Sequence, residues 1–135
     1  MTKKLIIYTD GGARGNPGPS GIGAVIFDEE KNVLEEISKY IGNATNNQAE
    51  YKALIAGLAK ARELGGEEIE VFLDSELVVK QLNREYRVKD QQLALLFVEA
   101  YNISIGFKKI VFKHIPREKN KHADKLVNLA LDKAM

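Results

Sequence analysis

Hydrophobic and polar positions along the first forty residues follow the pattern of β-strands. Residues 5–9 are apolar at both odd and even positions, which is typical of a strand covered on both faces, and we expect this strand to stop at Asp10. A loop rich in glycine and proline, residues 11–19, leads to further strands at 22–27 and 33–41. The three strands are predicted to form an antiparallel meander.

From residue 47 the apolar residues recur at spacings of three and four, which is the period of a helix. This helix is expected to begin near Asn47 and to end at the Gly65-Gly66 pair. The pattern then predicts a strand at 69–73, helices at 77–82 and 90–102, a strand at 110–115, and a last helix through Ala123, Val127, Ala130 and Ala134. The order β-β-β-α-β-α-α-β-α predicts an α/β fold, a mixed sheet with helices packed on its faces. The length of 135 residues predicts a single domain over residues 1–135.

Composition narrows the classes of protein and of metal site. The chain has no cysteine and two histidines, which excludes disulfides, thiolate zinc sites and cysteine nucleophiles. Any metal would therefore be held by oxygen. No apolar run approaches the roughly 20 residues that span a bilayer, so we expect no membrane segment and a cytoplasmic protein.

The net charge of +1 hides a strong asymmetry along the chain. Taken alone, a value near zero argues against a nucleic-acid binder. Residues 28–76, however, hold twelve acids and five bases, a net charge of −7, whereas residues 106–135 hold eight bases and three acids, a net charge of +5. The charges of the basic C-terminal section and the acidic middle section largely cancel, so the net charge of the whole chain is close to zero.

Two aspartates follow apolar strands. Right-handed crossovers would make the strands before Asp10 and Asp74 parallel, so that both side chains lie at the sheet edge where such folds bind ligands. For Asp74 the alternative is the N-cap of a helix that starts near Ser75. Asp10 has no helix to cap, and a buried carboxylate is costly unless it is paired or bound to a metal.

Two more acids lie near predicted helix starts. Glu50 shares the core-facing stripe with Leu54 and Gly57; the alternative to a ligand is a capping box with Asn47 as N-cap and Glu50 at N3. For Asp124 the alternative is a solvated acid, since acids suit a helix N-terminus. The glycine-rich loop lacks the known phosphate-binding motifs, and viewed alone it is a hairpin connection.

Convergence of these four acids would need a cation. Four carboxylates at one end of a sheet repel one another, and their pKa values rise unless positive charge neutralises them. All-oxygen ligation suits Mg²⁺ or Mn²⁺, and a pair of such ions about 3.5 to 4 Å apart is a known device for displacement at a phosphodiester. The sequence therefore points to metal-dependent phosphodiester chemistry.

Five motifs in order resemble the type 1 ribonuclease H family across essentially the whole chain. They are residues 6–12 (IIYTDGG), 15–18 (GNPG), 45–50 (TNNQAE), the pair Asp74-Ser75, and 116–124 (PREKNKHAD). The resemblance implies a ribonuclease H-like fold, a five-stranded mixed sheet with three antiparallel strands, the others parallel, and helices on both faces. It also implies hydrolysis of the RNA strand of RNA/DNA hybrids to give 3′-hydroxyl and 5′-phosphate ends.

By this resemblance, the four acids match the family's catalytic metal ligands. Asp10 would bridge two Mg²⁺ ions, for which Mn²⁺ can substitute; Glu50 and Asp74 would hold the ion nearer the leaving oxygen, and Asp124 the ion that activates water. Positions that contact the hybrid in the family are matched by Gly11, Gly12, Asn16, Thr45, Asn46, Asn47 and Ser75. Distinguishing RNA from DNA there requires hydrogen bonds to 2′-hydroxyl groups.

The sequence departs from many family members in two places. Residues 83–89 are short and contain no tryptophan where a basic helix and loop are often inserted, so we expect weaker, more salt-sensitive binding. The remaining phosphate contacts are expected from Lys80, Arg84, Arg87 and Lys89. Many members also have a mobile histidine that helps product leave. His114 has the matching spacing before Asp124, but Ile115-Pro116 follows it, and Arg117 is the alternative.

Two other functions remain as alternatives. One is a catalytically idle module of this fold that binds hybrids or double strands, and the other is a related metal-dependent nuclease acting on DNA or junctions. We expect no separate hybrid-binding domain, no protein partner and a monomer.

Overall fold

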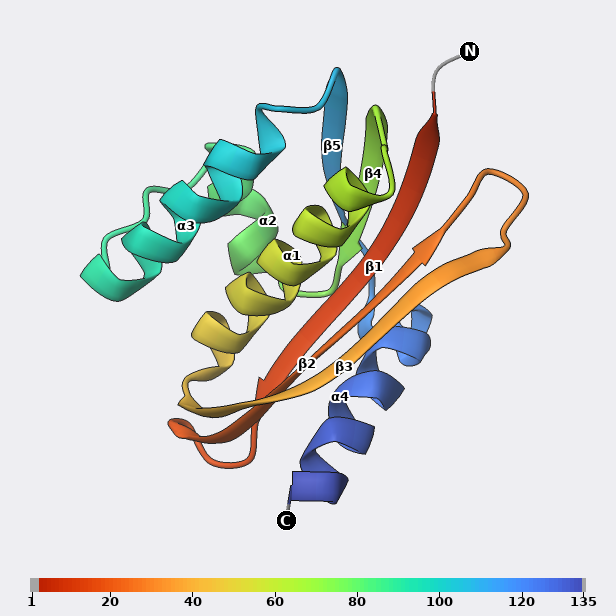
Figure 1. Cartoon of the computed structure of the whole chain (residues 1–135). Coiled ribbons are helices and arrows are strands. Elements are labelled where there is room, and N and C mark those ends of the chain that lie inside the picture. The colour runs from red at the N-terminus through yellow and green to blue at the C-terminus, as the bar shows by residue number, and fades with distance from the viewer. Residues whose placement is uncertain (1–2, 135) are drawn as a thin grey trace.

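The computed structural model describes residues 3–134. Figure 1 shows the elements, which follow in chain order as β1 (Lys4–Ala13), β2 (Gly18–Phe27), β3 (Val33–Ala44), α1 (Asn46–Glu63), β4 (Glu68–Leu73), α2 (Glu76–Leu82), α3 (Gln91–Ser104), β5 (Lys109–His114), a 3₁₀ turn (Arg117–Lys119) and α4 (Lys121–Ala134). The predicted order of strands and helices is confirmed, with this turn as the one addition. Within the described residues, no helix combines the length and the apolar character needed to span a bilayer.

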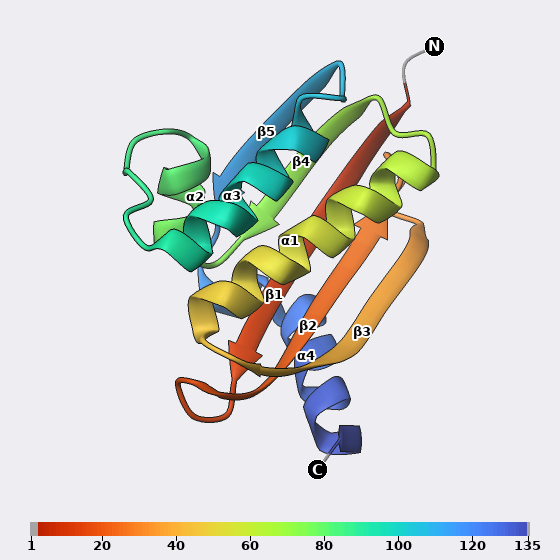
Figure 2. The ribbon, with the colours of Figure 1, turned by 60° about the vertical axis from the view of Figure 1, so that its left-hand side comes forward.

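The sheet has five strands in the order β3-β2-β1-β4-β5. β1 pairs antiparallel with β2, and β2 with β3, whereas β4 runs parallel to both β1 and β5. Helices α1 and α3 cover one face and α4 lies against the other (Figures 1 and 2). The predicted mixed sheet with helices on both faces is therefore confirmed.

β1 is longer than its sequence pattern predicts. We expected it to stop at Asp10 and a loop to follow over residues 11–19, but Gly11, Gly12 and Ala13 continue the ladder opposite β2. The prediction was wrong because glycines carry no side chain that signals a strand, whereas backbone pairing across the sheet keeps them extended. Asp10 consequently lies inside the strand, with three further strand residues after it.

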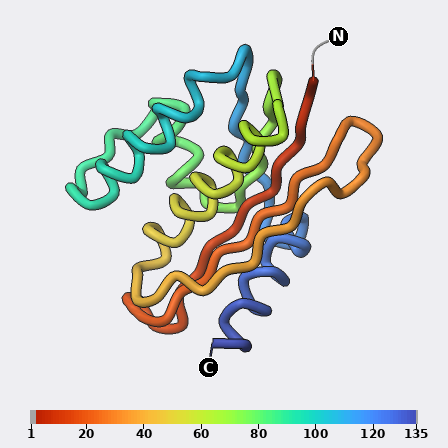
Figure 3. The backbone as a smooth tube through the Cα atoms, in the orientation of Figure 1, coloured from red at the N-terminus to blue at the C-terminus, as the bar shows by residue number. Residues whose placement is uncertain are grey.

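Two glycines let helices approach the central strands closely. A Cβ atom at Gly11 would lie 2.2 Å from the carbonyl oxygen of Ala49 in α1, and one at Gly23 would lie 2.3 Å from that of Ala123 in α4. Gly23 is also the residue of β2 that pairs with Asp10. Because Gly11 follows Asp10 and Gly23 pairs with it, these contacts bring α1 and α4 close to the sheet beside Asp10. Figure 3 shows the two helices on opposite faces of the sheet.

The main core lies between the sheet and α1, α2 and α3. Its fully buried side chains include Leu5 and Ile7 of β1, Leu54 and Leu58 of α1, and Val71 of β4. Burial of an aliphatic side chain contributes about 1.5 to 3 kcal/mol, so this layer anchors the strands and α1. Because the strands and α1 are anchored, the acidic residues that they carry, Asp10 in β1 and Glu50 in α1, are held in fixed positions.

Candidate active site

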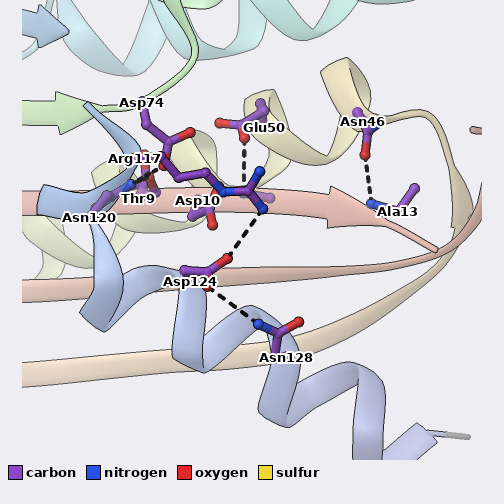
Figure 4. A network of polar contacts seen from close by, with 11 residues as sticks. Thr9, Asp10, Ala13, Asn46, Glu50, Asp74, Arg117, Asn120, Asp124 and Asn128 are labelled. Carbon is purple, nitrogen blue, oxygen red and sulfur yellow. Dashed lines mark hydrogen bonds and ion pairs between the residues drawn. The ribbon is translucent and has the colours of Figure 1, made fainter. Parts of the chain in front are cut away.

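The four predicted acidic ligands line a single open cleft of about 380 Å³. Asp10 comes from the middle of β1, Glu50 from the N-terminal half of α1, Asp74 from the residue after β4, and Asp124 from the first turn of α4. Figure 4 shows the four side chains turned toward one another. Segments more than a hundred residues apart in the sequence thus meet at one end of the sheet.

Three of these acids are close enough to share one cation. One carboxylate oxygen each from Asp10, Glu50 and Asp74 lies within 4.8 Å of the other two. Asp124 faces a different set of neighbours: its Oδ1 lies 3.9 Å from Nη2 of Arg117, and its Oδ2 accepts a hydrogen bond of 3.4 Å from Asn128. The cluster therefore consists of a group of three acids and a fourth beside it.

The capping alternatives for Glu50 and Asp74 are wrong. Helix α1 is capped by Thr45, whose side chain accepts from the backbone of Gln48 while the Gln48 side chain accepts from the backbone of Thr45. The capping box thus begins two residues before Asn47 and leaves Glu50 out. Ser75 caps α2 through the backbone N–H of Val78, so Asp74 has no capping role either.

Burial raises the pKa values of Asp10 and Glu50. Asp10 and Glu50 are each 7% exposed. Burial, with smaller contributions from the charges of Asp74 and Asp124, raises the pKa of Asp10 to about 7, although the adjacent Glu50 side chain acts in the opposite direction. Burial and the nearby charge of Asp10 also raise the pKa of Glu50 well above its usual value.

The donor set fits a hard divalent cation. The backbone N–H of Gly11 donates to Oε1 of Glu50 over 3.4 Å, but Oε2 of Glu50 is buried and has no hydrogen-bond partner. A buried carboxylate oxygen without a partner is costly unless a cation binds it. With three carboxylates within reach and no histidine or cysteine in the cleft, Mg²⁺ or Mn²⁺ is the class of ion that matches.

The predicted hybrid-contacting residues form a second cleft beside the first. Asn16, Thr45, Asn46 and Asn47 line a depression of about 420 Å³, and Asn46 borders both clefts. Its Oδ1 accepts from the backbone of Ala13 over 2.8 Å, and its own backbone N–H donates to Asn16 over 3.0 Å. These bonds fix the β1–β2 loop against the start of α1.

The other predicted contacts, Gly11, Gly12 and Ser75, lie at or next to the acidic cleft. The two glycines are among the residues that line it. Ser75 follows Asp74 directly, and its hydroxyl is engaged as the cap of α2. The structure therefore groups all seven predicted substrate positions around the two clefts.

Of the two residues considered for product release, the structure brings only Arg117 to the cleft. Arg117 lines it with a side chain that is 82% exposed. His114 is exposed at the end of β5 and is not among the residues that line the cleft.

The four predicted phosphate-binding residues lie on or beside the segment that connects α2 and α3. Lys80 forms an ion pair of 3.0 Å with Glu76, and Arg84 lies over the ring of Tyr101 at 5.8 Å. Arg87 and Lys89 are exposed. Lys80 thus already has an anionic partner within the protein.

Two asparagines in the network were missed as site residues. Asn120 donates to the carbonyl oxygen of Thr9 and to Oδ2 of Asp74, and Asn128 donates to Asp124 (Figure 4). A signal was present for Asn128 alone, because residues four apart share one side of a helix and Asn128 lies four residues after Asp124 in α4.

Comparison with known proteins yields close relatives. A family model described as reverse transcriptase-like matches residues 8–130. Ribonuclease HI of Halobacterium salinarum is 44% identical over 127 residues, which is 94% of this chain and 64% of the relative. The bifunctional protein Rv2228c of Mycobacterium tuberculosis is 46% identical over 132 residues, or 97% of this chain, but the chain spans only 36% of that relative's length.

A solved ribonuclease H1 structure resembles this chain over nearly the full length of both proteins. The crystal structure of LC11-RNase H1 in complex with an RNA/DNA hybrid is 52% identical to this chain, superimposes with a TM-score of 0.92, and covers 96% of this chain and 98% of its own. The reverse transcriptase-like model matches most of the chain, and a ribonuclease H1 of the same fold shares half of its residues. The chain therefore belongs to the type 1 ribonuclease H family.

Proposed function

We propose that this protein is an endoribonuclease that hydrolyses the RNA strand of RNA/DNA hybrids and leaves 3′-hydroxyl and 5′-phosphate ends. The observation that carries the proposal is the acidic cluster in the lining of the open cleft, where buried Asp10 and Glu50 and half-buried Asp74 lie together and one Glu50 oxygen has no partner. Family membership supports the activity. The hybrid bound by the relative LC11-RNase H1 supports the substrate.

The cofactor we propose is a pair of Mg²⁺ ions, with Mn²⁺ as a substitute. Asp10, Glu50 and Asp74 would hold one ion, and Asp124 with the shared Asp10 would hold the other. Bound there, the ions would supply Lewis-acid stabilisation of the phosphoryl group, an activated water and charge for the leaving oxygen. The positive charge of the ions would offset the mutual repulsion of the four carboxylates.

The protein's own polar groups would orient the hybrid. The second cleft presents the amide side chains of Asn16, Asn46 and Asn47 beside the acidic cleft, and Asn46 borders both clefts. Amides and backbone groups can donate hydrogen bonds to phosphates, and they can donate to or accept from 2′-hydroxyl groups. The bonds to 2′-hydroxyl groups are how proteins distinguish RNA from DNA. A cytoplasmic location, a monomeric state and the lack of a protein partner stay predictions.

A substrate panel tests the proposal against its alternatives. Labelled RNA/DNA hybrid, double-stranded RNA and double-stranded DNA of one sequence are incubated with the protein and Mg²⁺. We expect cleavage of the RNA strand of the hybrid alone, with products that a polymerase can extend from their 3′-hydroxyl ends. Binding of the hybrid without cleavage would indicate the idle module, and cleavage of DNA would indicate the related nuclease.

Hybrid affinity is expected to depend on salt through the α2–α3 segment. Each neutralised phosphate contributes about −0.7 to −0.9 to the slope of log K against log salt concentration. Replacing Arg87 and Lys89 together by glutamine should therefore make the slope less negative by roughly 1.4 to 1.8. Fluorescence anisotropy with a labelled hybrid in Ca²⁺, at a series of salt concentrations, measures this. An affinity that does not change with salt would rule out the electrostatic account.

Product release is expected to depend more on Arg117 than on His114, since only Arg117 lines the cleft. Arg117→Ala should lower steady-state kcat by up to about tenfold, or about 1.4 kcal/mol, and leave the single-turnover rate nearly unchanged. His114→Ala serves as the matched comparison and should have the smaller effect. A larger loss of turnover in His114→Ala would return the role to the histidine.

A further inference from the structure

Asn120 is a buried residue between the 3₁₀ turn and α4 that no step of the proposed chemistry uses. It is 1% exposed. Its side-chain nitrogen donates two hydrogen bonds, one of 2.9 Å to the carbonyl oxygen of Thr9 and one of 2.8 Å to Oδ2 of Asp74 (Figure 4). The residue thus joins the strand that carries Asp10 to the carboxylate that follows β4.

The amide orientation is fixed by its two partners, because a carbonyl and a carboxylate oxygen can only accept. Oδ1 of Asn120 consequently points elsewhere, and it is buried without a hydrogen-bond partner. A buried unsatisfied oxygen lowers stability, and an apolar side chain of similar size would avoid that cost. The presence of an amide at this position is therefore better explained by the two hydrogen bonds that its nitrogen donates than by a contribution to the stability of the core.

The position of Asn120 coincides with the end of the strand pairing. The parallel ladder between β1 and β4 ends at the pair Thr9 and Leu73, so the next residue, Asp74, lies beyond the sheet. Its carboxylate accepts from Asn120 where the ladder no longer holds the chain. The Asn120 side chain thus connects β1, through Thr9, to Asp74, the first residue after the paired part of β4.

The backbone of Asn120 acts on a second acid. Its carbonyl oxygen accepts from the N–H of Asp124 over 3.1 Å, which is the first turn of α4. Asn120 therefore holds Asp74 through its side chain and starts the helix turn that carries Asp124 through its main chain. Among the residues that the structure describes, no other one forms hydrogen bonds with both of these acids.

We propose that Asn120 is a positioning residue that sets the carboxylate of Asp74 for divalent-cation binding and keeps it in register with Asp10 and Asp124. The inference rests on the proposed function only for the identity of the cation as Mg²⁺ or Mn²⁺. Residues that hold metal ligands by hydrogen bonds typically change metal affinity or activity by about 10- to 100-fold when replaced. Asn120 is expected to act in that range through Asp74.

Metal titration without substrate tests the proposal. Asn120→Ala removes the donor, and Asn120→Asp keeps the shape but replaces the donor by an acceptor. Isothermal titration with Mn²⁺ should show binding weakened by about tenfold or more in both variants. In hybrid cleavage, kcat at a fixed low Mg²⁺ concentration should fall, KM for the hybrid should stay within about twofold, and higher Mg²⁺ should restore part of kcat.

A matched control is available in the turn between β2 and β3. There Asn32 donates to Oδ2 of Asp28 over 3.0 Å, an amide-to-carboxylate bond far from the cleft. Asn32→Ala should leave Mn²⁺ affinity and kcat unchanged. This control shows whether an effect on Mn²⁺ binding arises from losing any amide-to-carboxylate hydrogen bond or specifically from losing the bond between Asn120 and Asp74.

Two results would overturn the proposal. One is a folded Asn120 variant that binds Mn²⁺ as tightly as the parent; the other is loss of the folded state in both variants, which would make the residue a requirement of the fold. Failure of the proposed function has a different signature. A parent protein that binds Mn²⁺ but cleaves no hybrid would refute the nuclease, while the Mn²⁺ titration of Asn120→Ala would still decide the role of Asn120.

Discussion

Asp10→Asn is expected to abolish hybrid cleavage while preserving or raising the thermal stability of the metal-free protein. Loss of the ligand that we propose both ions share would remove several kcal/mol of charge stabilisation from the reaction, and about 4 kcal/mol corresponds to roughly a thousandfold in rate. The stability of the metal-free protein, in contrast to its activity, should stay the same or rise. The substitution removes a buried charge that lies near Asp74 and Asp124.

The pH dependence of stability follows from the same shift. In the folded, metal-free protein the pKa of Asp10 is about 7, above its ordinary value of 3.8, so the folded state binds this proton more tightly than the unfolded state. The associated stability is fully present below about pH 4 and is lost as the pH rises through about 7. The raised pKa of Glu50 acts in the same direction.

Thermal unfolding in EDTA at pH 5 and pH 8 measures this effect. The parent protein should lose stability between the two values, and Asp10→Asn should lose less. At pH 8 we expect the variant to be more stable by up to a few kcal/mol, because one pKa unit corresponds to about 1.4 kcal/mol. A large drop in the melting temperature of Asp10→Asn would instead make Asp10 a structural residue.

Gly11→Ala is expected to cause the largest loss of stability of any single methyl addition in the cleft. The new Cβ would lie 2.2 Å from the Ala49 carbonyl oxygen and 2.6 Å from the Glu50 backbone nitrogen, so α1 must move away from β1. Such overpacking costs about 1 to 3 kcal/mol and occasionally more, and the clash with backbone places this case at the upper end. Displacement of α1 also displaces Glu50, so activity should fall as well.

Chemical denaturation of Gly11→Ala and Gly12→Ala provides the comparison. At Gly12 the nearest atom to an added Cβ is a Val127 methyl group at 3.8 Å, an ordinary contact, so that variant should unfold near the midpoint of the parent. Equal midpoints for Gly11→Ala and the parent would mean that α1 does not depend on this close approach.

The strand and helix order was predictable because the apolar periods change clearly at residue 47 and at the Gly65-Gly66 pair. The end of β1 was not. Glycines 11 and 12 predict a turn locally, and only pairing with β2 keeps them in the sheet. Likewise, Asn47 and Thr45 are both good N-caps, and the choice was made by Gln48, whose side chain completes the box with Thr45.

The acidic residues could be picked out from the sequence because a carboxylate on an apolar strand or stripe contradicts its surroundings. Asn120 gave no such signal, since one asparagine before a helix is ordinary. Its role depends on Thr9 and Asp74, which lie 111 and 46 residues away in the chain. Contacts of that range are set by the sheet register and by the close approach of α4 at Gly23.

Metal dependence of hybrid cleavage tests the central claim most directly. A labelled RNA/DNA hybrid is incubated with the protein in Mg²⁺, in Mn²⁺ and in EDTA, with Asp10→Asn as the control in each. We expect cleavage of the RNA strand in Mg²⁺ and Mn²⁺, none in EDTA, recovery when Mg²⁺ is added back, and none with the variant. Cleavage by the parent protein that persists in EDTA would contradict the metal-dependent account.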